Sequence, residues 1–151
     1  MILKYITNSS SQTKKIGEFF AKKIIKTNPL RSAILIGLKG DLGGGKTTFL
    51  QGFAKGLGVK EKITSPTFVI MKKYRIENSK LKIANFFHLD CYRIQKPREI
   101  LNIGFRKIIS NKKNIIAVEW AERIKKLISP KNVWITFKLV NKKKREIKIK
   151  I

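Results

Sequence analysis

The residues from Gly40 to Thr47 have the types and the spacing to bind the phosphates of a nucleotide. They read Gly-Asp-Leu-Gly-Gly-Gly-Lys-Thr, which fits the pattern G-x-x-x-x-G-K-[ST]. The glycines at 43–45 allow the backbone to turn its N–H groups toward an anion. The apolar run 33–38 predicts a strand before the loop, and apolar residues at helical spacing in 49–57 predict a helix after it. This order predicts a triphosphate-binding loop rather than a chance glycine-rich turn.

Each polar side chain of this loop has a distinct chemical task. Lys46 is predicted to place its positive charge against the β- and γ-phosphates, which makes it a catalytic candidate as well as a binding residue. The Thr47 hydroxyl is a hard oxygen ligand, suited to Mg²⁺. The loop residues that we expect to contact the nucleotide are Asp41, Leu42, Gly43, Gly44, Gly45, Lys46, Thr47 and Thr48.

Acidic residues are scarce, with nine among 151 positions, so their placement is informative. Hydrolysis of a triphosphate needs a group that orients the attacking water, and Asp90 is the candidate for this catalytic role. Glu119 ends the apolar run 115–118, where a carboxylate can face Mg²⁺ at the edge of a sheet. The alternative for Glu119 is a surface acid that caps the next helix. His88, the only histidine, is expected to be a buried strand residue rather than a base.

Length and composition predict one compact domain that spans residues 1–151, since 42% of the residues are hydrophobic. The single cysteine, Cys91, excludes an internal disulfide and a site with several thiolate ligands. No run resembles a signal peptide or reaches the length of a membrane span. We therefore expect a cytoplasmic protein with no membrane and no disulfide partner.

The net charge of +26 raises the question of a polyanionic partner. The 28 lysines and 7 arginines are spread along the sequence, and they form no single stripe with interleaved aromatic residues. Lysine, isoleucine and asparagine are residues that A/T-rich codons encode, which favours codon drift as the main source of the charge. Weak or indirect binding of tRNA stays open as an alternative.

The pattern of apolar residues and turn residues predicts a three-layer α/β domain, in which helices flank a mixed sheet. Strands are expected at 1–7, 33–38, 115–118, 133–140 and 146–151, and a hairpin at 68–76 and 81–89. Helices are expected from the serines at 9–11 to about residue 26, from the loop to residue 57, over 97–103, over 105–109 and over 121–128.

Four motifs in order resemble the TsaE (YjeE) family of P-loop NTPase-like proteins. They are Gly-Asp-Leu-Gly-x-Gly-Lys-Thr-Thr at 40–48, Thr-Ser-Pro-Thr-Phe at 64–68, His-x-Asp-x-Tyr-Arg at 88–93 and Val-Glu-Trp at 118–120. The resemblance runs from the N-terminal helix to Trp120, and the C-terminal strands match in length and type only. Apart from the phosphate loop, each of these motifs is weak evidence for the family by itself. The four motifs in this order are specific for it.

The resemblance implies a bacterial ATPase that works with the TsaD and TsaB proteins, with ATP and Mg²⁺ as cofactors. These proteins form N6-threonylcarbamoyladenosine (t6A) at position 37 of tRNAs that read codons beginning with A. ATP hydrolysis in the family has low intrinsic activity and supports repeated turnover, while TsaD performs the transfer.

The resemblance also implies roles for individual residues. Glu119 matches the magnesium-binding acid, Asp90 an acid needed for hydrolysis, and the segment 64–68 a switch-like loop. Trp120 matches a residue beside the nucleotide, with packing of a strand end as an equal alternative. Ser10 and Ser11 correspond to positions near the base or ribose, although relatives often carry an acid there.

Two other classes of function fit parts of the sequence. A small-molecule kinase would use the same phosphate loop, but would need an arginine-bearing lid where this chain has its Thr-Ser-Pro-Thr segment. A basic tRNA-binding adaptor with a vestigial nucleotide site would explain the charge instead.

Overall fold

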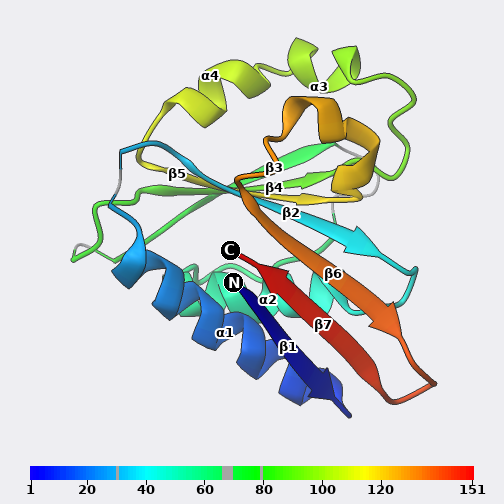
Figure 1. Ribbon diagram of the computed structural model, residues 1–151. Coiled ribbons are helices and arrows are strands. Elements are labelled where there is room, and N and C mark those ends of the chain that lie inside the picture. Colours follow the sequence, from blue (N-terminus) through cyan, green and yellow to red (C-terminus); the bar gives the residue numbers. More distant parts are fainter. Residues whose placement is uncertain (30, 66–69, 79) are drawn as a thin grey trace.

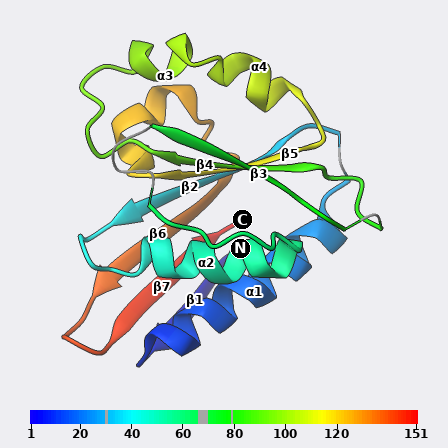
Figure 2. The same ribbon diagram turned by 180° about the vertical axis from the view of Figure 1, so that it is seen from behind.

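The molecule is built on a mixed β-sheet with helices on both faces (Figure 1; Figure 2). The structure, a computed structural model, describes residues 1–29, 31–65, 70–78 and 80–151. Its strands are β1 (Ile2–Thr7), β2 (Ile34–Gly40), β3 (Met71–Arg75), β4 (Asn85–Asp90), β5 (Asn114–Glu119), β6 (Val133–Leu139) and β7 (Arg145–Lys150). Its helices are α1 (Ser10–Thr27), α2 (Lys46–Leu57), α3 (Arg98–Asn102), α4 (Phe105–Ser110) and the 3-10 helix η1 (Ala121–Leu127). The predicted three-layer α/β fold is confirmed.

The order of the strands places the phosphate loop beside the acidic residues. Among the described residues the sheet has the order β1-β7-β6-β2-β5-β4-β3. Strands β6, β2, β5 and β4 run parallel, whereas β3, β7 and β1 pair antiparallel with their neighbours. The carboxyl ends of the parallel strands therefore meet at one edge, which is where ligands bind in open α/β sheets.

The two faces of the sheet are covered to different extents. Helices α1 and α2 lie on one face and bury a large cluster that includes Phe20, Phe53 and Ile147. Helices α3, α4 and η1 lie on the other face, over β2, β5 and β4, with a smaller cluster that includes Leu89 and Val118. That second group of helices leaves the corresponding face of β1 and β7 open.

Helices α1 and α2 approach each other very closely, which fixes the helix that follows the phosphate loop. A Cβ atom on Gly52 would lie 1.9 Å from the carbonyl oxygen of Lys14, and one on Gly17 would lie 2.2 Å from that of Phe49. Larger side chains at either glycine would push the helices apart. Ser9 caps α1, as predicted for the serines at 9–11, because its hydroxyl accepts a hydrogen bond from the backbone N–H of Gln12 at 3.1 Å.

Two elements differ from the sequence prediction. The hairpin of β3 and β4 forms, but its strands are shorter than expected, and positions 68 and 69 lie outside the described residues. The predicted helix over 121–128 is instead the 3-10 helix η1, kinked at Ile124, where φ is −123°. Because Ile124 leaves the helical region, a continuous α-helical hydrogen-bond ladder cannot form. No helix in the described part of the chain has the length and apolar character required to cross a membrane.

Candidate nucleotide-binding site

The phosphate loop connects the end of β2 to the start of α2. Gly43 and Gly45 have φ values of 72° and 99°, a region that other residues adopt only with strain. The backbone N–H of Gly44 donates to the carbonyl of Asp41 at 3.0 Å, which closes a turn inside the loop. Gly45 then stands at the N-terminus of α2, so the first N–H groups of that helix point toward the loop.

Lys46 is held beneath the loop. Its ammonium group donates to the carbonyl oxygens of Gly40 at 2.9 Å and Asp41 at 2.8 Å, and only 5% of the residue is exposed. Burial lowers the pKa of Lys46, and the nearby carboxylates, Glu119 foremost, oppose that shift. Its direct acceptors are neutral carbonyls, so a phosphate oxygen would supply the opposite charge that favours the ammonium form.

Glu119 connects the loop to the centre of the sheet. One carboxylate oxygen accepts a hydrogen bond from the Thr47 hydroxyl at 2.8 Å, and the other lies 2.6 Å from Nε2 of His88. Since a carboxylate can only accept, Nε2 of His88 carries a proton and orients the acid. Both Glu119 and His88 are buried. His88 is therefore a buried strand residue that positions Glu119, as a lone histidine between strand residues suggests.

Asp90 lies beside Glu119 because β4 and β5 are parallel and in register, with Asp90 and Glu119 as partners. Its two oxygens accept hydrogen bonds from the Ser65 hydroxyl and from the backbone N–H of Tyr92, each at 2.9 Å. Ser65 belongs to the segment 64–68, of which 66–68 lie outside the described residues. Asp90 therefore joins the end of a central strand to the start of that segment.

Aromatic rings border the site beside Lys46. The Lys46 ammonium lies 4.3 Å from the ring centroid of Trp120, and Tyr92 packs against the same indole at 5.0 Å between centroids. The Arg123 guanidinium lies 5.8 Å from the Trp120 ring. Trp120 has a φ of 56°, a strained conformation for a non-glycine residue. The indole therefore borders Lys46 directly rather than only packing a strand end.

These groups surround a cavity of about 330 Å³. It is lined by Leu42, Gly43, Gly45, Lys46, Thr47, Thr48, Ser65, Asp90, Tyr92, Glu119 and Trp120. Nine of these eleven residues are among those predicted from the sequence, and they come from the phosphate loop and from the ends of β4 and β5. The structure thus brings together residues that are far apart in the sequence, and the most distant pair, Leu42 and Trp120, is separated by 78 positions.

Four residues predicted to contact the nucleotide do not line this cavity. The Asp41 carboxylate turns away and accepts a hydrogen bond from the backbone N–H of Leu139 at 3.0 Å, and Gly44 is buried. Ser10 lines an adjoining cavity of about 220 Å³, which shares Gly43, Gly45 and Thr48 with the first. Ser11 lines neither cavity. The expected contacts of Ser10 and Ser11 with a base or ribose stay predictions.

Sequence reasoning missed several residues that shape the site. Ser65 and Tyr92 lie within recognised motifs, so their positions gave a signal, but their contacts with Asp90 required the fold. Arg123 lies in none of the motifs, so the sequence did not indicate its place at the site. The same holds for Arg145, whose side chain donates a hydrogen bond to the carbonyl of Gly43 at 2.9 Å and so connects the β6–β7 hairpin to the phosphate loop.

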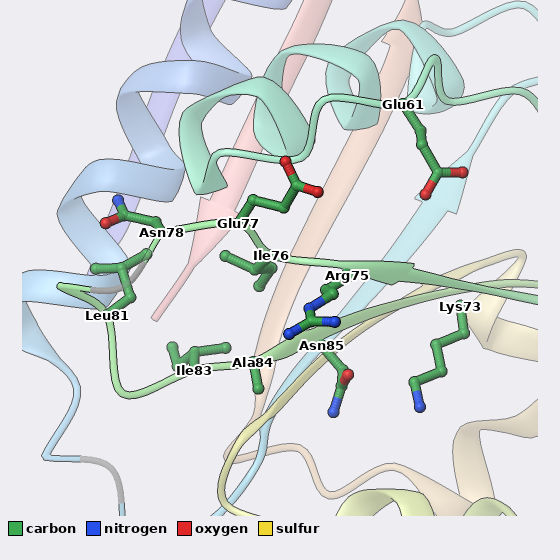
Figure 3. Close-up of a pocket in the computed structure, with 10 residues that line it drawn as sticks. All are labelled: Glu61, Lys73, Arg75, Ile76, Glu77, Asn78, Leu81, Ile83, Ala84 and Asn85. Carbon is green, nitrogen blue, oxygen red and sulfur yellow. The ribbon is translucent and has the colours of Figure 1, made fainter.

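A larger cavity, of about 890 Å³, lies elsewhere, along β3 and the start of β4 (Figure 3). Its charged residues are Glu61, Lys73, Arg75 and Glu77. Figure 3 shows the two carboxylates on one side and the two cationic side chains on the other, spread around an open hollow. This cavity lacks the glycine loop and the convergent oxygen ligands found beside Lys46.

Comparison with known proteins agrees with this geometry. The family model described as "Threonylcarbamoyl adenosine biosynthesis protein TsaE" matches residues 7–147. The chain belongs to the TsaE family. The TsaE protein of Rickettsia typhi is 35% identical over 144 residues, which cover 95% of this chain and 91% of the relative. The TsaE protein of Bacillus subtilis is 32% identical over 145 residues, which cover 96% and 83%.

A solved structure supports the same assignment. The crystal structure of YdiB from Bacillus subtilis matches with a TM-score of 0.70 and 28% identity, over 99% of this chain and 84% of that one. This TsaE-family chain therefore has a P-loop fold of the nucleotide-binding type and belongs to the pathway that makes threonylcarbamoyladenosine in tRNA.

Proposed function

We propose that this TsaE protein is a single-domain ATPase, over residues 1–151, that works with TsaD and TsaB to form t6A at position 37 of tRNAs reading codons that begin with A. The observation that carries the proposal is the register of β4 and β5, which sets Asp90 beside Glu119 at the phosphate loop. A tRNA-modifying role places the protein with its tRNA in the cytoplasm.

The residues present fit Mg²⁺ together with a triphosphate. Thr47 and Glu119 offer hard oxygen atoms that already lie within 2.8 Å of each other. Among the described residues, no group of three or more histidine, cysteine or acidic side chains has the arrangement to hold a metal ion by itself. Mg²⁺ that accompanies a nucleotide commonly takes one or two protein ligands and completes its coordination with phosphate and water oxygens, which Thr47 and Glu119 fit. When bound, Mg²⁺ would neutralise charge on the β- and γ-phosphates.

The other side chains have roles that follow from their contacts. Lys46 and the N–H groups at the start of α2 bind the phosphates and fix their orientation. His88 holds the Glu119 carboxylate in place. Asp90 accepts a hydrogen bond from the attacking water and aligns it with the γ-phosphate, exchanging its contact with Ser65 for one with water.

Reconstitution tests the proposal. TsaD, TsaB, tRNA and the threonylcarbamoyl donor are combined with and without this protein, and both t6A and free phosphate are measured over several turnovers. We expect repeated turnover only with the protein present, and γ-labelled phosphate released as free phosphate. Unchanged t6A yield without it would contradict the role in the pathway, and label on a metabolite would show a kinase.

A further inference from the structure

The exposed face of β1, β6 and β7, on the side that carries η1, collects lysines that are far apart in the sequence. Side chains alternate along a strand. The inward residues, such as Phe137, Ile147 and Leu3, pack against α1 and α2. Their neighbours therefore point to the opposite face, where the strand register aligns Lys39, Thr136, Lys148 and Lys4 in a row across β2, β6, β7 and β1.

This row, called here the lysine row, is electrostatically unfavourable by itself. Lys4 and Lys148 are directly opposite each other, and like charges in that position destabilise a sheet. One acid, Glu146, lies between them, 3.0 Å from the Lys4 ammonium and 3.2 Å from that of Lys148. A chain with nine acids therefore uses one to hold the row together, and a polyanion would relieve the remaining repulsion.

A tryptophan lies next to the lysine row. The indole of Trp134 lies against β2 at Gly37, which has no side chain. A Cβ atom at that position would come within 2.9 Å of the ring, so a larger residue would collide with the indole. Its ring nitrogen donates to the carbonyl of Ser129 at 3.3 Å. The ammonium of Lys39 lies 5.6 Å from the ring centroid. Because Lys39 is exposed and lysine has a long side chain, its ammonium can reach a phosphate while a base takes its place on the ring.

Lys39, Trp134 and Thr136 line a cavity of about 390 Å³, within the size range of small-molecule sites. Lys125, Lys148 and Lys150 add positive charge around Trp134. Glu122 also lines the cavity, and one of its carboxylate oxygens is buried with no hydrogen-bond partner among the described residues. As a residue that lines the cavity, Glu122 also offers a carboxylate, which accepts hydrogen bonds from groups such as a ribose hydroxyl or a base amino group.

We propose that this open face of the sheet, centred on Trp134 and the lysine row, binds single-stranded RNA. Stacking of a base on an aromatic ring within a positively charged groove is the general mode of single-strand recognition. A second copy of this chain would present the same positive face and be repelled. An apolar peptide would leave the lysines without counter-charge. The proposal is independent of ATP hydrolysis, so its test is done without nucleotide.

The first experiment measures binding of a fluorescein-labelled, unstructured RNA decamer at several salt concentrations. A ten-base-pair RNA duplex serves as the shape control, and polyglutamate serves as an acidic-protein control. We expect the single strand to bind about 10-fold more tightly than the duplex, since only its bases are free to stack. Equal binding of the duplex, or equal competition by polyglutamate per charge, would overturn the proposal.

Matched variants locate the binding surface. Trp134→Ala is expected to weaken RNA binding about 10-fold, and Trp134→Phe, which keeps a ring, less than about 3-fold. Lys39→Gln with Lys150→Gln is expected to reduce the slope of log K against log salt by about 1.4. The control, Lys15→Gln with Lys26→Gln on α1, removes the same charge from the other side of the sheet. An equal loss of slope in the control would show diffuse attraction and refute the site.

A spectroscopic measurement tests the same contact with the Trp134 side chain left in place. In a Trp120→Phe background, Trp134 is the only tryptophan left. Stacking of a base should quench its fluorescence as the RNA decamer saturates the protein. If RNA binds without quenching, the bases do not reach Trp134 and the proposal is wrong.

Discussion

The two halves of the sheet use charged residues in opposite ways. The parallel strands β4 and β5 bury Asp90, Glu119 and His88, and the two acids each accept two contacts from neighbouring groups. In the other half, strands β1, β6 and β7, which are joined by antiparallel pairing, keep their lysines exposed, and Lys150 illustrates this at the end of β7. Burial of charge is costly unless the group is paired, so the parallel half tolerates few substitutions. The exposed half accumulates lysines at little cost.

This contrast predicts that the two halves can be altered separately. Substitutions at the phosphate loop and the acidic edge should change nucleotide-dependent properties and leave RNA binding intact. Substitutions around Trp134 should do the reverse. The variants below test that separation, beginning with the largest expected effect.

Lys46→Ala should have the largest effect. Loss of the buried ammonium removes the positive charge against the phosphates, so ATP hydrolysis should fall about 1,000-fold and Mg·ATP binding about 100-fold. Calorimetric titration and phosphate release measure these two quantities. Lys55→Ala, on the exposed side of the same helix, is the control and should match the unmodified protein. Equal loss in the control would contradict a specific role for Lys46.

Asp90→Asn should separate binding from hydrolysis. The amide keeps the size of the side chain but is a poor acceptor for a water proton, so hydrolysis should fall about 100-fold. Affinity for Mg·ATP should stay within about 3-fold of the original. A parallel loss of affinity would instead mean that Asp90 holds the nucleotide or the fold. RNA binding should not change in either case.

His88→Phe should have a smaller effect, confined to the metal. It removes the donor that orients Glu119 and keeps a ring beside Phe86, so the Mg²⁺ concentration for half-maximal activity should rise about 10-fold. The maximal rate at saturating Mg²⁺ should change little. His88→Gln, which keeps a donor, should give an intermediate value. A lower maximal rate with an unchanged Mg²⁺ requirement would point to His88 as a base.

Gly37→Ala tests the same separation by altering the surface around Trp134 instead of the phosphate loop. The added methyl group would contact the Trp134 ring, so we expect a loss of about 1 kcal/mol in the free energy of unfolding and weaker RNA binding. Nucleotide affinity should be unchanged, since Gly37 does not line the phosphate cavity. Urea unfolding and both binding assays provide the comparison. A matching loss of ATP affinity would show that the halves are coupled through β2.

Cys91→Ala should have the smallest effect of these substitutions, a change in the free energy of unfolding that is visible only at high pH. Burial raises the pKa of Cys91 from the ordinary value of 9.0 to about 12, which favours the neutral thiol in the folded state. Its contribution to stability is therefore complete below about pH 9 and is lost as pH rises toward 12. Urea unfolding from pH 8 to 11 should show a steeper decline for the original protein than for Cys91→Ala. Identical slopes would contradict the shift.

The sequence alone determined the parts of this protein that depend on local geometry. The glycines at 43–45, followed by Lys46 and Thr47, specify a phosphate loop because only that backbone can turn its N–H groups toward an anion. Apolar periodicity likewise gave the order of strands and helices. The ends of elements were less certain, as with η1, because a kink at Ile124 depends on packing that no local pattern records.

Only the tertiary structure decided which distant residues meet. The parallel register of β4 and β5 pairs Asp90 with Glu119, and the register of β6 with β7 and β7 with β1 turns scattered lysines into a row. Neither result is visible in the sequence, because a shift of one residue would move every side chain to the opposite face. The fold therefore places the acids at a buried edge and the lysines on an open face.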